Sequence, residues 1–343
     1  MVANRRFWEC AAITVAIVTL SCGGSSAPTA PPPGPPANGP AVGAGTVLSL
    51  RSAETDQPVA GAAILLSGQS TAGTFSRSFT SDQAGQFTLD RTVLLSPAPL
   101  LDVTAAGFVT RTTLLRQDET TLSLWPATSS TGLDEEFSST AVYSSSACPA
   151  VNTGLSPLRR AATSVETVQV MFGTSIQDEA AQAAHQLAIS RLNTAMAGAL
   201  RYEFTTAPTS SVWFVVEVEP NHSTCAAGPE PLRAATELNS SNLAVIGGRL
   251  VYCSVNAARS ATLILHELGH TLGLYHSSST SDVMYCSSGR PAQFSSREHL
   301  AMRLARQRHP GNRWPDNDRL AAAPLGFGPS ATQTIMCGDR GPR

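Results

Sequence analysis

The chain has 343 residues, which is enough for two ordinary domains, and its 23 basic and 25 acidic side chains nearly cancel. Every basic residue is an arginine, and the arginines are scattered rather than gathered around aromatic side chains. This distribution argues against a surface for DNA or RNA, so we expect no nucleic-acid partner.

Residues 1–21 have the proportions of a signal peptide. Arg5 and Arg6 precede an apolar run, residues 11–20, that is too short to cross a bilayer. The segment Thr19-Leu20-Ser21-Cys22 resembles the lipobox of bacterial lipoproteins, in which the cysteine receives lipid and becomes the new N-terminus. The resemblance implies an exported protein anchored through Cys22 in the bacterial cell envelope, at the outer membrane or cell surface. A plain secretory signal with an incidental cysteine is the alternative, and it implies a secreted protein.

Residues 22–44 follow as a predicted tether. The segment 23–45 contains seven prolines and no charged side chain. Such a composition cannot bury a core, and as an extended spacer it would reach on the order of 60 Å at ~3 Å per residue. The tether would hold a folded body away from a membrane, although a secretory linker without an anchoring role has the same composition.

Residues 45–125 are predicted to form an all-β sandwich. Short runs rich in β-branched and apolar residues alternate with Gly, Pro, Asp and Ser. The stretches QPVAGAAILLSG, SFTSDQAGQFTL and LLDVTAAGFVTRTTL resemble the carboxypeptidase-regulatory-like family, a transthyretin-type sandwich. The resemblance carries no catalytic residues, so this domain is expected to act as a stalk, as a contact for glycan or protein, or as a passive spacer.

Residues 134–320 are predicted to form an α+β domain, followed by a C-terminal tail, residues 321–343. Strands are expected at 165–172, 200–207, 211–220 and 249–255. An amphipathic helix is expected from Ile176 to Gly198. Its predicted core stripe is Ile176, Ala180, Ala184, Leu187, Leu192 and Met196.

The string HELGHTLGLYH, residues 266–276, carries the chemistry. On a helix, His266 and His270 lie four residues apart on one face and can bind one metal ion, and Glu267 can lean over it. Gly273 tolerates the left-handed conformation that ends a helix and turns His276 back. Three imidazoles leave one position open, as in catalytic zinc, where a bound water has a pKa of about 7. We therefore predict Zn²⁺ on the three histidines and Glu267 as the general base.

The same string is a metzincin signature, and its continuation SDVMY places Met284 at the methionine turn of that family. The run from His266 to Tyr285 resembles the matrixin branch most closely. The resemblance implies a metzincin-like α+β fold in which Met284 supports the metal site. It also implies a substrate-binding edge strand before the zinc helix, and residues 241–254 are expected to supply it. A peptide would add there through main-chain hydrogen bonds, and an ordinary sheet strand is the alternative.

Other histidines and acidic residues are assigned no ligand role. The helix expected over residues 297–308 resembles the closing helix of metzincin domains, and Glu298, His299 and His309 are expected on its solvated face. His185 and His222 have no partner spacing. No calcium loop is evident beyond the short Asp316-Asn317-Asp318, so calcium dependence stays open.

Five cysteines would remain after export and lipidation. In an oxidising compartment four of them are expected to pair. The sequence does not define the pairing of Cys148, Cys225, Cys253, Cys286 and Cys337. No PRCGxPD-type cysteine switch is present, and Cys148-Pro149 could either block the zinc through its thiolate or join a disulfide.

Together these features predict an exported, membrane-tethered zinc metalloendopeptidase that acts on a protein or peptide. The alternative is a surface-tethered binding or adhesion lipoprotein whose metzincin-like domain is inactive. The sequence defines neither the cleavage specificity nor the oligomeric state.

Overall fold

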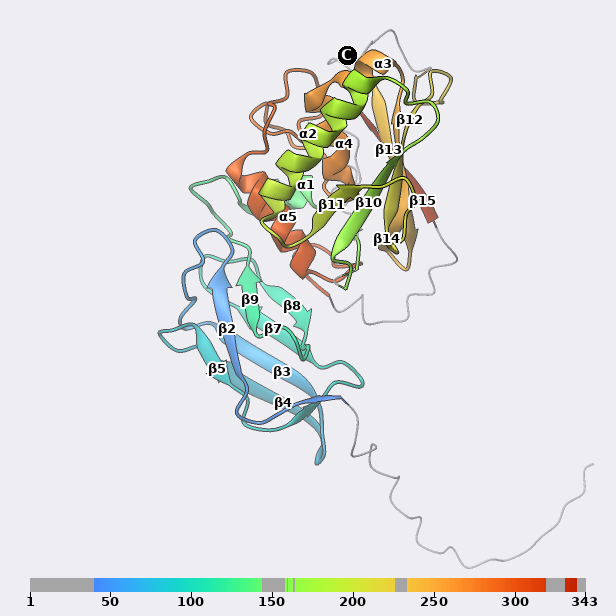
Figure 1. The fold of residues 1–343 in the computed structure, drawn as a ribbon. Coiled ribbons are helices and arrows are strands. Elements are labelled where there is room, and N and C mark those ends of the chain that lie inside the picture. Colours follow the sequence, from blue (N-terminus) through green and yellow to red (C-terminus); the bar gives the residue numbers. More distant parts are fainter. Residues whose placement is uncertain are drawn as a thin grey trace, which may run out of the picture. The chain divides into compact units, whose positions relative to one another are not determined.

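The computed structural model describes residues 40–143, 158, 160–162, 164–225, 233–318 and 331–337 (Figure 1). All of them belong to one of the two units into which the chain divides, residues 36–343. The predicted signal peptide, Cys22 and Cys148 lie outside the described residues. Within the described ranges, no helix combines the length and the apolar character needed to cross a bilayer.

Between residues 40 and 125 the described elements are all strands. They are β1 (Ala41–Val42), β2 (Val47–Ser52), β3 (Ala63–Ser70), β4 (Gly73–Thr80), β5 (Gln86–Thr88), β6 (Val93–Leu94), β7 (Leu100–Thr104), β8 (Arg111–Leu114) and β9 (Thr121–Leu124). One sheet has the order β1-β6-β3-β7-β8, with β4 paired to β3, and a smaller sheet has the order β5-β2-β9.

Alternation along these strands builds one core between the two sheets. Leu48 and Leu50 of β2 and Ile64 and Leu66 of β3 are buried at every second position, as expected where one face of a strand is covered. The two sheets therefore share a hydrophobic core, as in a β-sandwich. Strand β1 falls inside the range predicted as tether, so regular structure begins a few residues before residue 45.

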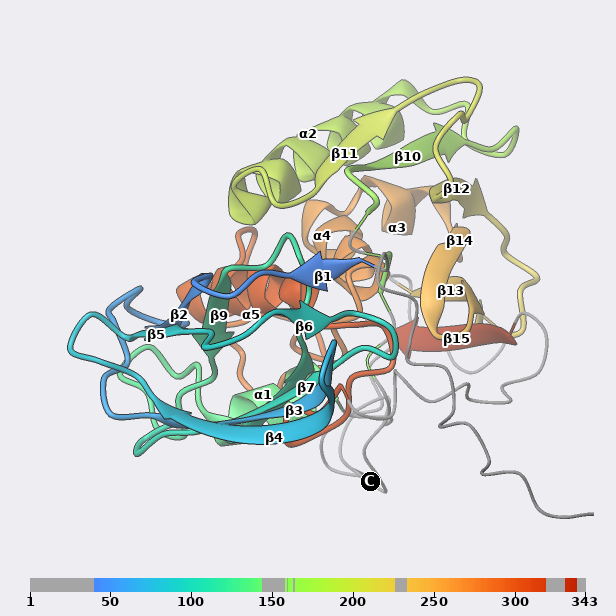
Figure 2. The same cartoon turned by 90° about the horizontal axis from the view of Figure 1, so that it is seen from below.

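The second part of the chain contains a six-stranded sheet of order β11-β10-β12-β14-β13-β15 (Figure 2). Its strands are β10 (Thr167–Phe172), β11 (Arg201–Phe204), β12 (Trp213–Val218), β13 (Ala234–Ser241), β14 (Ala244–Tyr252) and β15 (Ala331–Cys337). The first four strands in this spatial order are parallel, whereas β13 is antiparallel to β14 and β15 is antiparallel to β13. Strand β15 lies within the predicted C-terminal tail.

The prediction that residues 241–254 form an edge strand was wrong. Strand β14 is hydrogen-bonded to β12 on one side and to β13 on the other, so it lies inside the sheet. The hairpin between β13 and β14 places the earlier strand, β13, farther from β12, and β15 covers its outer side. A pattern of apolar residues identifies a strand but does not say which of two hairpin neighbours lies outside.

The described helices begin at residues whose side chains cap them. The helices are α1 (Glu135–Ala141), α2 (Glu179–Met196), α3 (Val255–Arg259), α4 (Ala261–Thr271) and α5 (Ser296–Gln307). Asp178 and Ser260 each accept a hydrogen bond from a backbone N–H group in the first turn of α2 and α4, respectively. Ser295 and Glu298 form a capping box at the start of α5.

The predicted core stripe of α2 was partly wrong. Leu187 is 49% exposed, and Ala180 is also exposed. The buried face instead follows Ala181, His185, Ala188, Leu192 and Ala195. Because alanines occur on both faces of α2, the two faces look alike in the sequence. The buried face also contains a histidine, which made that face look polar.

The sandwich strands contact the segment that follows α5. The backbone of Thr112 exchanges hydrogen bonds with Asp316 and Asp318, and the Thr113 hydroxyl donates to Asp318 at 2.8 Å. Arg308 forms a fully buried ion pair with Asp316. Val109 and Trp125 belong to the core of the second part of the chain.

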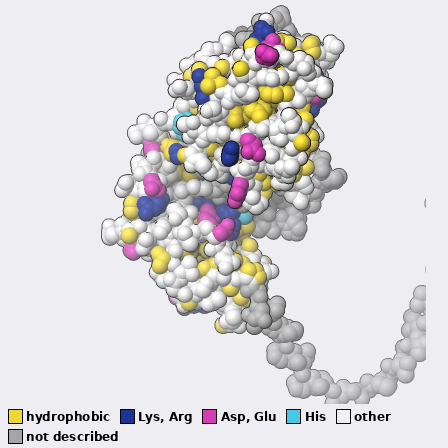
Figure 3. Space-filling view, viewed as in Figure 1, with side chains coloured by type: hydrophobic (Ala, Val, Ile, Leu, Met, Phe, Trp, Pro, Cys, Tyr) yellow, Lys and Arg dark blue, Asp and Glu magenta, His cyan; other side chains and the backbone are white. Residues whose placement is uncertain are grey.

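On the face visible in Figure 3, acidic and basic side chains are interspersed, without a large patch of one sign.

Candidate metal centre

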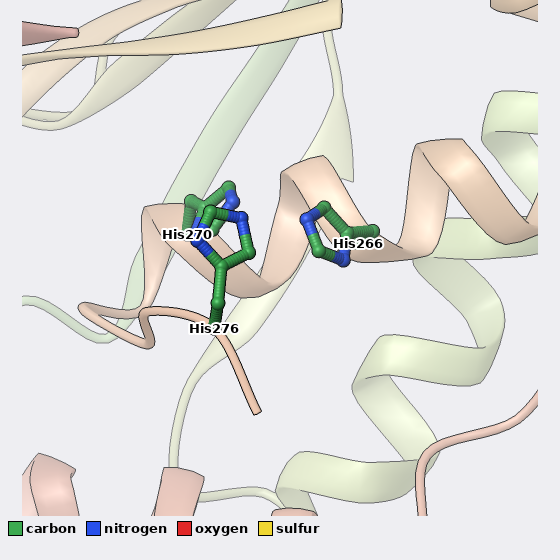
Figure 4. A group of neighbouring side chains, drawn as sticks. All are labelled: His266, His270 and His276. Atoms are coloured by element: carbon green, nitrogen blue, oxygen red, sulfur yellow. The ribbon is translucent and has the colours of Figure 1, made fainter. Parts of the chain in front are cut away.

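Three buried histidines converge beside helix α4. His266 and His270 come from successive turns of this helix, and His276 comes from the chain that follows it (Figure 4). Their ring centroids lie 4.8, 4.9 and 5.1 Å apart, and their candidate ligand atoms all lie within 4.8 Å of one another. Among the described residues, this is a group of side chains that could hold a metal ion.

Gly273 brings the third histidine back to the helix. Its φ of 87° lies in the left-handed region, and the N–H of Leu274 donates to the carbonyl of Gly269. The prediction that glycine ends this helix in a left-handed conformation is confirmed. The following residue, Tyr275, donates its N–H to Ala141 at the end of α1 at 2.7 Å, which fixes the chain immediately before His276.

Backbone carbonyls orient two of the imidazoles. His266 Nδ1 lies 2.7 Å from the carbonyl oxygen of Val283, and His270 Nδ1 lies 2.7 Å from that of Leu274. Since a carbonyl oxygen can only accept, each Nδ1 donates and each Nε2 keeps its lone pair for a metal. The sequence pointed to the three histidines but not to these partners, because hydrogen bonds to the backbone leave no residue-type signature.

Burial keeps these rings neutral. Because an imidazolium is poorly solvated in the protein interior, burial lowers the pKa of His266 well below its usual value and that of His270 to about 4. Both rings are therefore uncharged near pH 7, which is the form that binds metal.

Glu267 is fully buried and is held by a residue of β13. The hydroxyl of Thr236 lies 2.6 Å from Glu267 Oε2 and 3.1 Å from the Glu267 carbonyl oxygen. A threonine hydroxyl has one proton, so it donates to one of these oxygens at a time. No sequence signal marked this contact, because the two residues are 31 positions apart and threonine is common in strands.

Met284 packs against the metal-site helix. It is fully buried, and its carbonyl accepts from the N–H of Ser277, next to His276. Its own N–H and that of Val283 donate to the carboxyl group of Glu298 at 2.8 and 3.2 Å. Glu298 thereby holds the turn whose Val283 carbonyl orients His266.

The expectation of a solvated Glu298 was wrong, because this side chain is 0% exposed. Burial, reinforced by the charge of Asp282, raises its pKa to about 7. His299 and His309 lie outside the histidine group, and both are partly buried rather than fully solvated.

The other polar candidates have structural partners. Asp316 pairs with Arg308, and Asn312 donates to both Asp316 and Asp318. The short acidic segment therefore has protein donors around its carboxylates. His185 is buried between the rings of Phe172 and Tyr252, with its pKa lowered to about 4 by burial.

Three of the described cysteines are oxidised. Cys225 and Cys253 form a disulfide that joins the segment after β12 to the end of β14, and Cys286 is also disulfide-bonded. The side chain of Cys337 lies outside the described residues. His222, close to Cys225, contacts Glu237 at 3.0 Å.

Comparison with known proteins agrees with this site. Residues 176–298 match the model of the Matrixin family of peptidases. The matched segment runs from just before α2 into the first turn of α5 and includes the three histidines, Glu267 and Met284. It supports a matrixin-like metallopeptidase domain, with the α+β metzincin-like fold and zinc dependence of that family. A search of curated proteins found no match to the chain.

Proposed function

We propose that this protein is a zinc-dependent endopeptidase in which His266, His270 and His276 hold the metal and Glu267 is the general base. The observation that carries the proposal is the convergence of three buried imidazoles beside a buried carboxylate. The Matrixin match over the same residues supports it.

The residues present fit zinc. Three nitrogen ligands with an open fourth position are the donor set of catalytic zinc. Two of the rings already donate to backbone carbonyls, as metal-binding imidazoles typically do. When bound, zinc would supply a Lewis acid that polarises a peptide carbonyl and lowers the pKa of water.

The protein side chains would then move the proton and keep the site in place. Glu267 would accept a proton from the attacking water and deliver it to the nitrogen of the departing amine. Thr236 would hold the Glu267 carboxylate in position through its hydroxyl. Met284 would support the helix from below, while Glu298 fixes the turn that carries it.

Glu267→Gln tests the mechanism, because it preserves size and helix propensity but removes the base. We expect the variant to fold, to retain zinc, and to lose peptidase activity by a factor of at least ~10². Glu179→Gln, at an exposed position in the first turn of α2, is the matched control and should retain activity. A Glu267→Gln protein as active as the wild type would exclude this mechanism.

A surface-tethered binding or adhesion protein with an inactive metzincin-like domain is the alternative. The intact triad and the buried Glu267 favour the enzyme. If the zinc-loaded wild-type protein cleaved nothing in a diverse peptide library, the binding function would be favoured instead.

We further propose export and anchoring through Cys22, based on the short apolar segment before this cysteine and the uncharged spacer after it. Replacing Cys22 with Ala should abolish incorporation of labelled lipid and move the protein from the membrane fraction to the soluble fraction. Membrane association that persists without Cys22 would overturn the anchor.

A further inference from the structure

The outer edge of β13 lies beside the metal centre. Thr236, the third residue of this strand, contacts the carboxylate of Glu267. The inner edge of β13 is paired with β14. The outer edge is therefore the side of the sheet on which an extended peptide could add a strand next to the catalytic residues.

A segment of the same chain fills this edge. Strand β15 pairs antiparallel with β13 from Ala234 opposite Cys337 to Ser240 opposite Ala331 (Figure 2). Main-chain pairing of this kind depends little on the identity of the side chains. A peptide substrate and β15 would accordingly compete for the same backbone groups.

Ile335 anchors this segment on the side of the sheet that faces the catalytic helix. It lies directly opposite Thr236, and directly opposed residues point to the same face of a sheet. Thr236 reaches Glu267 on that face, so Ile335 lies on the same side and is 5% exposed, within the core. Ile335 thus lies beside Thr236, in the place that the side chain of a peptide substrate paired with β13 would take.

Among the other described side chains of β15, Ala331, Thr332 and Thr334 are exposed and Gln333 is half-buried. Thr332 donates a side-chain hydrogen bond to Asn239 at 2.9 Å, and the Ser240 hydroxyl donates to the carbonyl of Ala331 at 3.3 Å. Over residues 331–335 the strand is therefore held by backbone hydrogen bonds, these two polar contacts and one apolar anchor.

We propose that residues 331–337 occupy the outer edge of β13 in cis and keep the protein latent by excluding an extended peptide from that edge. The latency rests on the proposed peptidase function, whereas the competition for the edge does not. A tethered segment competes at an effective concentration in the millimolar range, so a free peptide would bind well only after the segment is displaced.

Ile335→Asp in the full mature, zinc-loaded protein tests the proposal, because it places a charge in the buried anchor. Ala331→Asp is the matched control, since it adds the same charge at an exposed position of β15 opposite the uncharged Ser240. We expect Ile335→Asp to lower KM for long peptide substrates about tenfold, with kcat little changed, because one buried aliphatic side chain is lost from the competitor. Ala331→Asp should behave as the wild type.

A second readout does not depend on cleavage. A fluorescent peptide with the sequence of residues 331–336, ATQTIM, should bind Ile335→Asp about tenfold more tightly than it binds the wild type or Ala331→Asp, as measured by anisotropy. Should the aspartate variant fail to fold, Ile335→Ala serves in both assays.

The outcomes separate the two proposals. Tighter peptide binding by the Ile335 variant without cleavage in any variant would support the competition for the edge and overturn the peptidase. Cleavage by all variants with the same KM and the same peptide affinity would overturn that competition and the latency while leaving the peptidase intact.

Discussion

Gly269 and Met284 are in direct steric contact across the metal-site helix. A Cβ added to Gly269 would lie 2.3 Å from the sulfur of Met284. Methionine is flexible, but this one is fully buried and cannot swing into solvent. The glycine between Glu267 and His270 is therefore required by the residue that packs beneath it, although glycine lowers helix propensity.

Gly269→Ala should consequently destabilise the protein. In an exposed helix the same substitution stabilises by up to ~1 kcal/mol, whereas overpacking a core costs about 1–3 kcal/mol. We expect a lower free energy of unfolding in denaturant titrations together with weaker zinc binding. Gly43→Ala, where an added Cβ would meet nothing within 4 Å, is the control and should change neither quantity. A Gly269→Ala variant more stable than the wild type would show that the Met284 packing is dispensable.

His276→Ala should lower the affinity for zinc by a factor of more than ~10². Replacing a residue that only hydrogen-bonds to a metal ligand can already lower metal affinity by up to about that factor, and removing a ligand itself should cost more. His299→Ala and His309→Ala should leave metal content unchanged, since neither side chain belongs to the histidine group. Metal analysis after dialysis against a zinc buffer measures all three proteins. Equal zinc retention would reject His276 as the third ligand.

Thr236→Val keeps the shape of the side chain but removes its hydroxyl. A hydrogen bond to a charged group contributes about 1.5–3 kcal/mol, so kcat should fall roughly 10- to 100-fold as Glu267 loses its orientation. KM should change little, and Thr236→Ser should recover most of the rate. If valine and serine reduced kcat equally, the hydroxyl would have no positioning role.

The pKa of about 7 for Glu298 predicts a stability that depends on pH. Its folded-state pKa lies above the ordinary value of 4.5. The buried neutral acid therefore stabilises the fold fully at low pH, and this contribution decreases as the pH rises from the ordinary value towards 7. Thermal melts at about pH 5 and pH 8 should show a larger loss of stability for the wild type than for Glu298→Gln, which cannot ionise. Parallel pH profiles for the two proteins would argue against this titration.

Residues 134–343 prepared alone should be less stable than the full chain. Val109 and Trp125 contribute to the core of the second part of the chain, and Thr113 is a hydrogen-bond partner of the buried Asp318. Their removal exposes apolar surface and leaves buried polar groups unpaired. The thermal midpoint should fall by several degrees, and an unchanged midpoint would show that the second part folds independently of the first.

The sequence was informative where chemistry requires particular residues at fixed spacing. The spacing of His266, His270 and His276 and the left-handed Gly273 follow from helix geometry, and the structure brings the three side chains together around that turn. The α+β order of elements was also predictable, since buried strands and capped helices have distinct periodicities.

The features that sequence reasoning missed depend on tertiary packing. The Thr236 hydroxyl reaches Glu267 only because β13 and α4 pack together, and Glu298 is buried only because the turn at Met284 folds over it. The edge assignment failed for the same reason, because strand order in a sheet is a long-range property. No local pattern marked β15, whose polar residues resemble those of a tail.

Because of the contact between Tyr275 and Ala141, the three histidines of the candidate metal centre come together at different stages of folding. His266 and His270 share one helix and can form their half of the site locally. The chain before His276 is fastened to α1, more than a hundred residues earlier in the sequence, and closing such a loop is slow compared with forming a helix. The nascent chain would thus present a loose two-histidine site first, and tight metal capture would report that the segment linking the two parts of the protein has docked.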